Sequence, residues 1–172
     1  IKIGDSEYET PDLPLGVDSE TASYLSVSEK IAVIDYASFR RPDKILNVID
    51  NARKEVGYNR LVYAHSVEPK DMPLLAYLGV AIFDNPALSF RTVTGFALED
   101  GEWVKDDRKN LKKFNQEALL IWIKRIRRYL AEGRLREMVE KTSLHNPRNM
   151  EILRKATQIL EDTGGDPRNE IK

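Results

Sequence analysis

Residues 74–84 read Leu-Leu-Ala-Tyr-Leu-Gly-Val-Ala-Ile-Phe-Asp, and they contain the change of pattern that decides the fold. The leucines have helical spacing and stop at Gly79, and the short apolar run 80–83 then leads directly into Asp84. A continuous apolar run of this length is typical of a strand that is buried on both faces. The segment therefore predicts a helix followed by a buried strand with a carboxylate at its end.

The same alternation occurs upstream. Apolar runs at 30–36 and 60–64 predict two more buried strands, and the apolar residues between Pro42 and Gly57 recur at helical spacing. The order strand, helix, strand, helix, strand is typical of a parallel sheet. Helices on one side only would leave the other face of the sheet bare. We therefore expect the unit to be part of a barrel, or to be covered by the remaining chain or by a partner.

The C-terminal third predicts helices. Residues 96–104 are a hairpin candidate with Asp100-Gly101 as the turn, and helical patterns cover 116–131, 135–141 and the residues after Pro147. The predicted fold class is α/β: a partial TIM-barrel-like βαβαβ unit followed by a C-terminal helical segment. We expect three parts along the chain: an irregular acidic N-terminal arm (1–29), an α/β domain with its C-terminal helices (30–163) and a flexible tail (164–172).

Composition narrows the classes of function. The 172 residues include no cysteine and two histidines, His65 and His145, which excludes disulfides, thiol catalysis and thiolate-bound metals. We expect no metal and no cofactor, because the sequence has neither a metal-spaced cluster nor a phosphate-binding glycine loop. No apolar run approaches about eighteen residues, so we expect no membrane partner, and in the absence of a signal pattern the expected compartment is the cytoplasm.

The net charge of −1 conceals a division along the chain. Residues 1–30 carry two Lys/Arg against seven Asp/Glu, a net charge of −5, whereas residues 105–141 carry twelve against six, a net charge of +6. Such asymmetry predicts a surface for nucleic acid or for an acidic partner, and a solvated helix surface is the alternative. The candidate phosphate-binding residues are Lys124, Arg125, Arg127, Arg128 and Arg134.

Polar residues follow each predicted strand. Asp84, His65 and the pair Asp35-Tyr36 come at carboxyl ends of strands, where parallel α/β folds place their sites. A carboxylate at position 84 could act as nucleophile or general base, and His65 could hydrogen-bond a ligand. The alternatives are structural: Asp84 could cap the turn formed with Asn85-Pro86, and His65 could be an ordinary loop histidine.

The motifs together resemble the tRNA-guanine transglycosylases, and most closely their archaeal branch. The resemblance covers roughly residues 31–160, which correspond to the C-terminal half of the catalytic domain in that family. In this family a helix that ends in glycine leads to a short strand and a Phe-Asp pair. The segments that carry the resemblance are 74–84, 94–101, Asn115 with the long helix after it, 131–139 and 143–147.

The resemblance implies a (β/α)₈-barrel ancestry and a link to the exchange of guanine for a deazaguanine base in tRNA. It places Asp84 at the position of the nucleophilic aspartate. The second aspartate of the family and its zinc site of three cysteines and a histidine have no counterpart here; residues 106–109 stand where the zinc site should lie. The chain is therefore most similar to a reduced version, the transglycosylase-like domain of archaeosine synthases.

Three hypotheses follow from this resemblance. In the first, the chain is non-catalytic alone and supports archaeal tRNA 7-deazaguanine modification, binding tRNA and either a catalytic chain of the archaeosine pathway or a second copy of itself. In the second, it is an oligomeric base-exchanging or nucleoside-processing enzyme that uses Asp84 as nucleophile. In the third, it is a protein-interaction module without nucleic acid.

Overall fold

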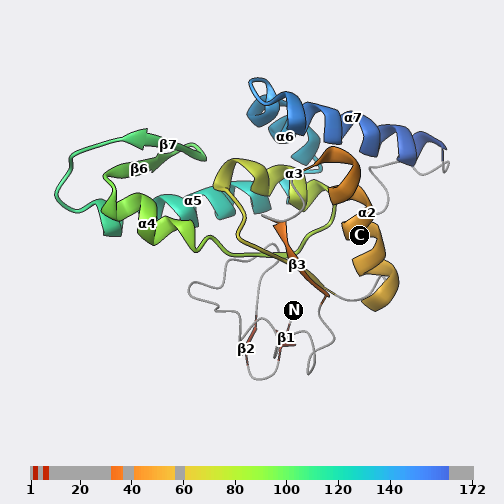
Figure 1. Ribbon diagram of the computed structural model, residues 1–172, viewed down its shortest axis with the longest axis horizontal. Coiled ribbons are helices and arrows are strands. Elements are labelled where there is room, and N and C mark those ends of the chain that lie inside the picture. Colours follow the sequence, from red (N-terminus) through yellow and green to blue (C-terminus); the bar gives the residue numbers. More distant parts are fainter. Residues whose placement is uncertain (1, 4–5, 8–31, 37–40, 57–60, 163–172) are drawn as a thin grey trace.

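The computed structural model describes residues 2–3, 6–7, 32–36, 41–56 and 61–162 (Figure 1). The predicted acidic arm lies outside these residues apart from two short strands, and the predicted tail lies outside them entirely. The strands are β1 (Lys2–Ile3), β2 (Ser6–Glu7), β3 (Ala32–Asp35), β4 (Val62–His65), β5 (Ile82–Phe83), β6 (Phe96–Glu99) and β7 (Glu102–Lys105). The helices are α2 (Pro42–Val56), the 3-10 turn η2 (Pro69–Asp71), α3 (Met72–Tyr77), α4 (Ala87–Val93), α5 (Leu111–Ala131), α6 (Leu135–Ser143) and α7 (Pro147–Asp162).

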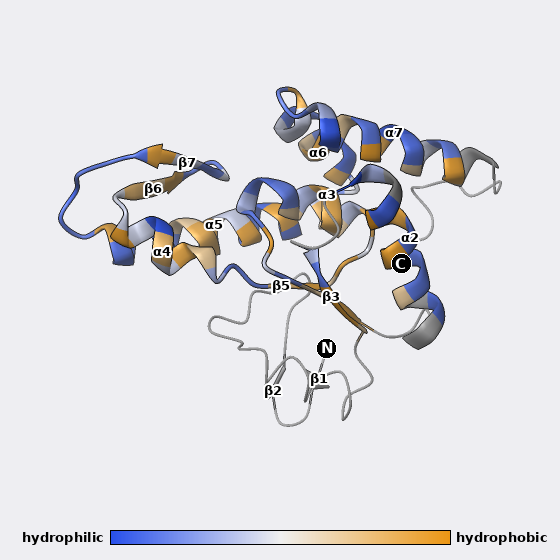
Figure 2. Cartoon of the chain, viewed as in Figure 1, coloured by the Kyte–Doolittle hydropathy of each residue, from blue (hydrophilic) through white to orange (hydrophobic). Residues whose placement is uncertain are grey.

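A three-stranded parallel sheet in the order β3-β4-β5 lies at the centre of the fold. Its strands are strongly hydrophobic (Figure 2), as expected for parallel strands whose two faces are both covered. The helices α2 and α3 make the two crossovers. The predicted α/β class and βαβαβ order are thus confirmed, and within the described residues the sheet stays open and does not close into a barrel.

Alternate side chains of the sheet enter two separate apolar clusters. Ile34 and Ala64 join the main core, which also contains Ile45 of α2. Tyr63 and Ile82 point to the opposite face, where they are 0% and 2% exposed and form a cluster of their own. Because both residues are buried, the face away from the helices is not bare at the centre of the sheet.

The C-terminal helices pack around this unit. Helix α7 contacts α2, and α6 contacts α3, α5 and α7. Helix α5 begins at Leu111, so the predicted start at residue 116 was wrong, and α4 was not predicted. None of the helices that the structure describes is long and apolar enough to cross a membrane.

The β6–β7 hairpin confirms the predicted turn. Glu99 pairs with Glu102, which leaves Asp100 and Gly101 as a two-residue loop with φ values of 48° and 88°. Positive φ at both positions is the type I′ turn that favours Asp-Gly. A Cβ on Gly101 would lie 2.7 Å from the ring of Trp122, so glycine also permits the hairpin to pack closely on α5.

Asn115 holds the hairpin to α5 from inside the core. Its Oδ1 accepts the N–H of Leu98 at 2.8 Å, and its Nδ2 donates to the carbonyl of Phe96 and to Thr92 Oγ1, each at 2.8 Å. The residue is fully buried. These three bonds satisfy most of the amide, and Asn115 is therefore a structural residue in this fold.

Candidate functional site

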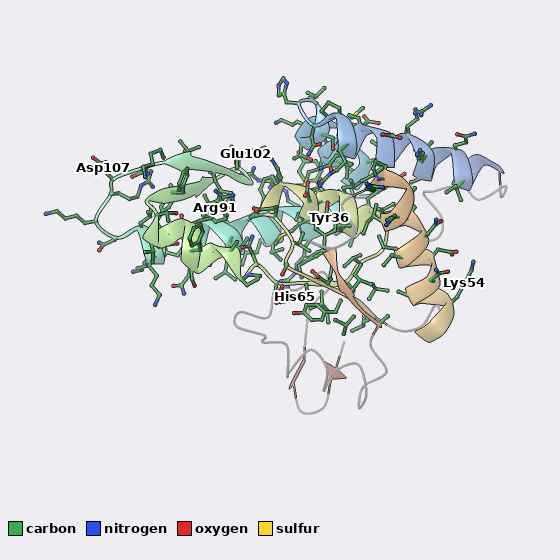
Figure 3. All side chains as sticks on the ribbon, viewed as in Figure 1. Tyr36, Lys54, His65, Arg91, Glu102 and Asp107 are labelled. Carbon is green, nitrogen blue, oxygen red and sulfur yellow. The ribbon has the colours of Figure 1, made fainter. Side chains whose placement is uncertain are left out.

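The carboxyl ends of the three parallel strands bring the predicted strand-end residues to one edge of the sheet. Asp35 ends β3 and is the register partner of His65, which ends β4. Asp84 directly follows β5, and its N–H donates to the carbonyl of Ala64 at 3.3 Å. His65 lies below the helical layer in Figure 3, on the side of the sheet away from α6 and α7.

The carboxylate of Asp84 is buried and accepts three hydrogen bonds. Its Oδ2 accepts from the Tyr63 hydroxyl at 2.7 Å and lies 2.7 Å from Nδ1 of His65. Its Oδ1 accepts the backbone N–H of Ser66 at 2.7 Å. Three donors offset much of the cost of burying a charged group, since the residue is only 3% exposed.

The loop after β4 is fastened to the residues after β5. Besides the Ser66 bond, the N–H of Val67 donates to the carbonyl of Asp84 at 3.0 Å, and Asn85 Nδ2 donates to the carbonyl of Val67 at 2.9 Å. Ser66 has a φ of 61°, in the left-handed region that residues other than glycine seldom adopt. Asp84 thus orders the neighbouring loop, which is a wider structural role than capping its own turn.

Tyr63 remains a neutral donor to this carboxylate. Burial raises the pKa of Tyr63 far above its usual value, and the hydrogen bond to Asp84 and the negative charge of Asp84 raise it further. The rings of Tyr63 and His65 meet edge to face, with centroids 6.4 Å apart. The hydroxyl therefore serves as a permanent hydrogen-bond donor below the alkaline range, and it fixes one oxygen of the carboxylate.

In this arrangement the side chain of His65 is partly exposed to solvent, and that of Asp84 is buried. The side chain of His65 is 28% exposed, whereas that of Asp84 is 5% exposed. A nucleophilic carboxylate must offer an oxygen to the reacting atom, and both oxygens of Asp84 are already held by neighbouring donors. The sequence placed both residues at strand ends, and the structure adds that they are in direct contact.

The predicted phosphate-binding residues occupy the α5 surface and the loop after it, and most already pair with acids. Arg125 pairs with Asp100 at 2.6 Å, and Arg128 with Glu132 at 3.8 Å. Lys124 is exposed and forms no ion pair with a described residue. Of the predicted cations within α5, Lys124 and Arg128 are therefore exposed, and Arg125 is half-buried.

The other two predicted cations differ in setting. Arg127 is half-buried, so it stands at the edge of the solvent-facing side of α5. Arg134 follows α5 and pairs with Glu137 at 2.8 Å and Glu132 at 3.3 Å. The hydrogen bond from Arg134 holds the pKa of Glu137 below its usual value. The five cations thus lie in the C-terminal half of α5 and just after it, and three of them pair with acidic residues.

A buried polar network between η2, α7 and the end of β3 was not predicted from the sequence. Asp71 accepts from Arg148 Nη2 at 2.6 Å, from the Tyr36 hydroxyl at 3.0 Å and from Asn149 Nδ2 at 2.7 Å. It joins η2 to the first turn of α7 and to the residue after β3. Of its members, only Tyr36 was singled out from the sequence, as part of the strand-end pair Asp35-Tyr36, and the structure places its hydroxyl here, on Asp71. Nothing in the sequence linked Asp71 to residues 77 and 78 positions later.

No family model matches the chain. Within the described residues, no group of three or more His, Cys, Asp or Glu side chains could hold a metal ion.

Three curated relatives match part of the chain, and all come from archaea. The chain is 31% identical to archaeosine synthase of Methanocaldococcus jannaschii over 111 residues, which cover 60% of this chain and 19% of that protein. It is 30% identical to archaeosine synthase of Haloferax volcanii over 120 residues, 58% of this chain and 20% of that protein. It is 24% identical to archaeosine synthase subunit alpha of Thermoplasma acidophilum over 117 residues, 66% of this chain and 23% of that protein.

The chain thus spans about a fifth of the length of the curated relatives it matches. The resemblance to the archaeosine synthases was predicted from the motifs around Asp84 and after α5. The matches over 111 to 120 residues confirm it.

Proposed function

We propose that this chain is a transglycosylase-like part of the archaeal machinery that makes archaeosine, the 7-deazaguanine nucleoside of tRNA. In this proposal it is non-catalytic alone, binds tRNA through the surface of α5, and works with a catalytic chain of the same pathway or with a second copy of itself. The observation that carries the proposal is the similarity to three archaeosine synthases over 111 to 120 residues.

The electrostatics of α5 support tRNA binding. Lys124 extends into solvent, and the nearby pairs of Arg128 and Arg134 with glutamates are exposed. Exposed ion pairs contribute only about 0–1 kcal/mol, so either arginine can leave its glutamate for a phosphate at little cost. Contacts of this kind position a nucleic acid without reading its sequence.

The burial of Asp84 supports the non-catalytic reading over an independent base-exchanging enzyme. Its two carboxylate oxygens are occupied by Tyr63, His65 and Ser66, so attack on a ribose carbon would require these bonds to break first. The third hypothesis is an interaction module without nucleic acid. It predicts that replacing the cations of α5 does not change the affinity of the chain for any RNA.

A comparison of charge-neutralised variants tests the proposal. Lys124→Gln and Arg128→Gln are measured beside Lys44→Gln, which removes an exposed lysine from α2, a helix that packs on β3 and α7. We expect the two α5 variants to weaken binding of archaeal tRNA by a similar factor for every tRNA sequence, with the salt slope reduced by about 0.7–0.9 for each lost phosphate contact. The control variant should bind as the wild type does. Equal binding by all four proteins would contradict the proposal.

Pull-down with the tagged chain addresses the partner. The proposal expects recovery of a catalytic protein of the archaeosine pathway or of an untagged copy of this chain. If neither of these partners is recovered and the wild-type chain does not bind tRNA, the proposal fails and the interaction-module hypothesis remains.

A further inference from the structure

The segment 66–68, between β4 and η2, is held in a strained conformation. Ser66 has a φ of 61°, in the left-handed region that a serine seldom adopts. Its N–H donates to the carboxylate of Asp84 at 2.7 Å. The N–H of Val67 donates to the carbonyl of Asp84, and Asn85 Nδ2 donates to the carbonyl of Val67. The residues after β5 therefore hold this segment in a conformation that its own backbone does not favour.

The same segment contacts the β6–β7 hairpin through its last residue, Glu68. Glu68 Oε2 accepts the indole N–H of Trp103, a residue of β7, at 2.8 Å. Glu68 Oε1 lies 3.8 Å from Nη2 of Arg91 on α4. The Glu68 side chain is only 21% exposed, so water screens these contacts in part. One carboxylate thus joins the strained segment to the hairpin and to α4.

The chain after Glu68 is fixed independently of the hairpin contact. The carbonyl of Pro69, at the start of η2, accepts the indole N–H of Trp122 at 2.7 Å. Asp71, at the end of the same turn, is held by Arg148 and two further buried donors. The strained segment therefore lies between two fixed elements, β4 and η2. A change of φ at residue 66 should move residues 66–68 and leave η2 in place.

We propose that segment 66–68 is a conformational link between the strand-end site and the β6–β7 hairpin, and that Asp84 is its positioning residue. While Asp84 accepts the N–H of Ser66, the segment presents Glu68 to the hairpin. When that bond is lost, Ser66 returns to a negative φ, the chain turns at this residue, and Glu68 leaves the indole of Trp103.

The link extends from the sheet to the surface of α5. The hairpin carries Asp100, whose carboxylate pairs with Arg125 at 2.6 Å. A ligand or partner that competes for the carboxylate of Asp84 therefore changes the surroundings of this arginine through the hairpin. Arg125 is one of the cations assigned to tRNA in the proposed function, whereas the link itself rests on the geometry alone.

Indole NMR tests the link, because the two tryptophans of the chain donate their N–H groups to Glu68 and Pro69. On the ¹⁵N-labelled chain, Trp103→Phe assigns the two indole signals. Ser66→Pro removes the N–H and fixes φ near about −65°, whereas the matched control Ser66→Gly keeps the N–H and adopts a positive φ without strain. We expect Ser66→Pro to move the Trp103 indole proton upfield and to speed its exchange with solvent, because its bond to a carboxylate is lost. The Trp122 signal should stay in place, and Ser66→Gly should match the wild type.

Asp84→Ala tests the positioning role from the other side of the same hydrogen bond. It removes the acceptor of the Ser66 N–H, so the Trp103 signal should move in the same direction as in Ser66→Pro. Tyr63→Phe is the control, because it removes a different hydrogen bond to the same carboxylate and should leave Trp103 unchanged. Lower stability alone does not move a signal of the folded chain.

The two variants remove one hydrogen bond from its two ends, so either decides the inference if the other does not fold. An unmoved Trp103 signal in folded Ser66→Pro or Asp84→Ala would overturn it. Equal shifts in Ser66→Gly or Tyr63→Phe, or a Trp122 signal that moves as far as that of Trp103, would overturn it as well.

These spectra are recorded without RNA, which separates the inference from the proposed function. If Trp103 does not respond while tRNA binds through α5, the inference fails and the proposed function stands. If Trp103 responds while tRNA does not bind, the proposed role in tRNA modification fails and the link stands.

Discussion

The ion pair between Arg148 of α7 and Asp71 of η2 gives a direct test of what holds α7 to the rest of the fold. Asp71 is 2% exposed and takes hydrogen bonds from Arg148, Tyr36 and Asn149. Replacing Arg148 by Met keeps an apolar stem of similar length and leaves the buried carboxylate with two neutral donors. We therefore expect Arg148→Met to lower the free energy of unfolding far more than an ordinary surface substitution.

The magnitude follows from burial. Removing one partner of a buried ion pair typically costs about 3–5 kcal/mol. The side chain of Arg148 is 26% exposed, so water already screens part of the pair. We expect the lower end of the range, about 3 kcal/mol, and with a urea m-value of about 2 kcal/mol/M the midpoint should fall by about 1.5 M.

Urea unfolding followed by circular dichroism measures this change. Arg154→Met is the matched control, because Arg154 is an exposed arginine on the same helix and its loss should cost no more than about 0.5 kcal/mol. Adding Asp71→Asn to Arg148→Met should recover part of the loss, since the uncompensated charge is gone. A loss below about 1 kcal/mol in Arg148→Met, or no recovery in the double variant, would refute the reasoning.

Three further predictions concern single contacts. Gly101→Ala should cost about 2–4 kcal/mol, because the residue has a φ of 88° and a Cβ would meet Trp122 at 2.7 Å, and near-UV circular dichroism should report the disturbed indole. Asn115→Ala should cost about 2–3 kcal/mol in urea unfolding, because the buried N–H of Leu98 loses its acceptor; a neutral result would show that the hairpin does not depend on it. The pKa of Tyr63 is higher in the folded chain than its usual value of 10.0, so stability linked to its proton falls as pH rises past that value. The unfolding free energy of the wild type should therefore decline relative to Tyr63→Phe above pH 10.0, and a constant difference would contradict the shift.

The parallel sheet could be predicted because its strands are continuous apolar runs bounded by helix signals. Helix α4 could not, since only Leu88 is buried and Phe90 and Val93 face solvent, which removes the helical period. The start of α5 was missed for a related reason. In its first turns the buried residues are Leu111 and the polar Asn115. Because the prediction depended on apolar residues at helical spacing, a buried asparagine did not count toward the buried face.

The candidate site was predictable in position and not in geometry. Strand ends of a parallel sheet gather at one edge, so Asp35, His65 and Asp84 could be placed together from the sequence. That the carboxylate would be buried beneath Tyr63 depends on register and on which face each side chain takes. The partnership of Asp71 with Arg148 spans 77 positions and has no local pattern at all.

The salt dependence of tRNA binding by the wild-type chain tests the central claim most directly. Phosphate contacts by the three exposed cations, Lys124, Arg128 and Arg134, predict a slope of log Kobs against log salt of about −2.1 to −2.7. A slope in this range on archaeal tRNA would support a role in tRNA modification. A flat profile, or no binding at low salt, would contradict it.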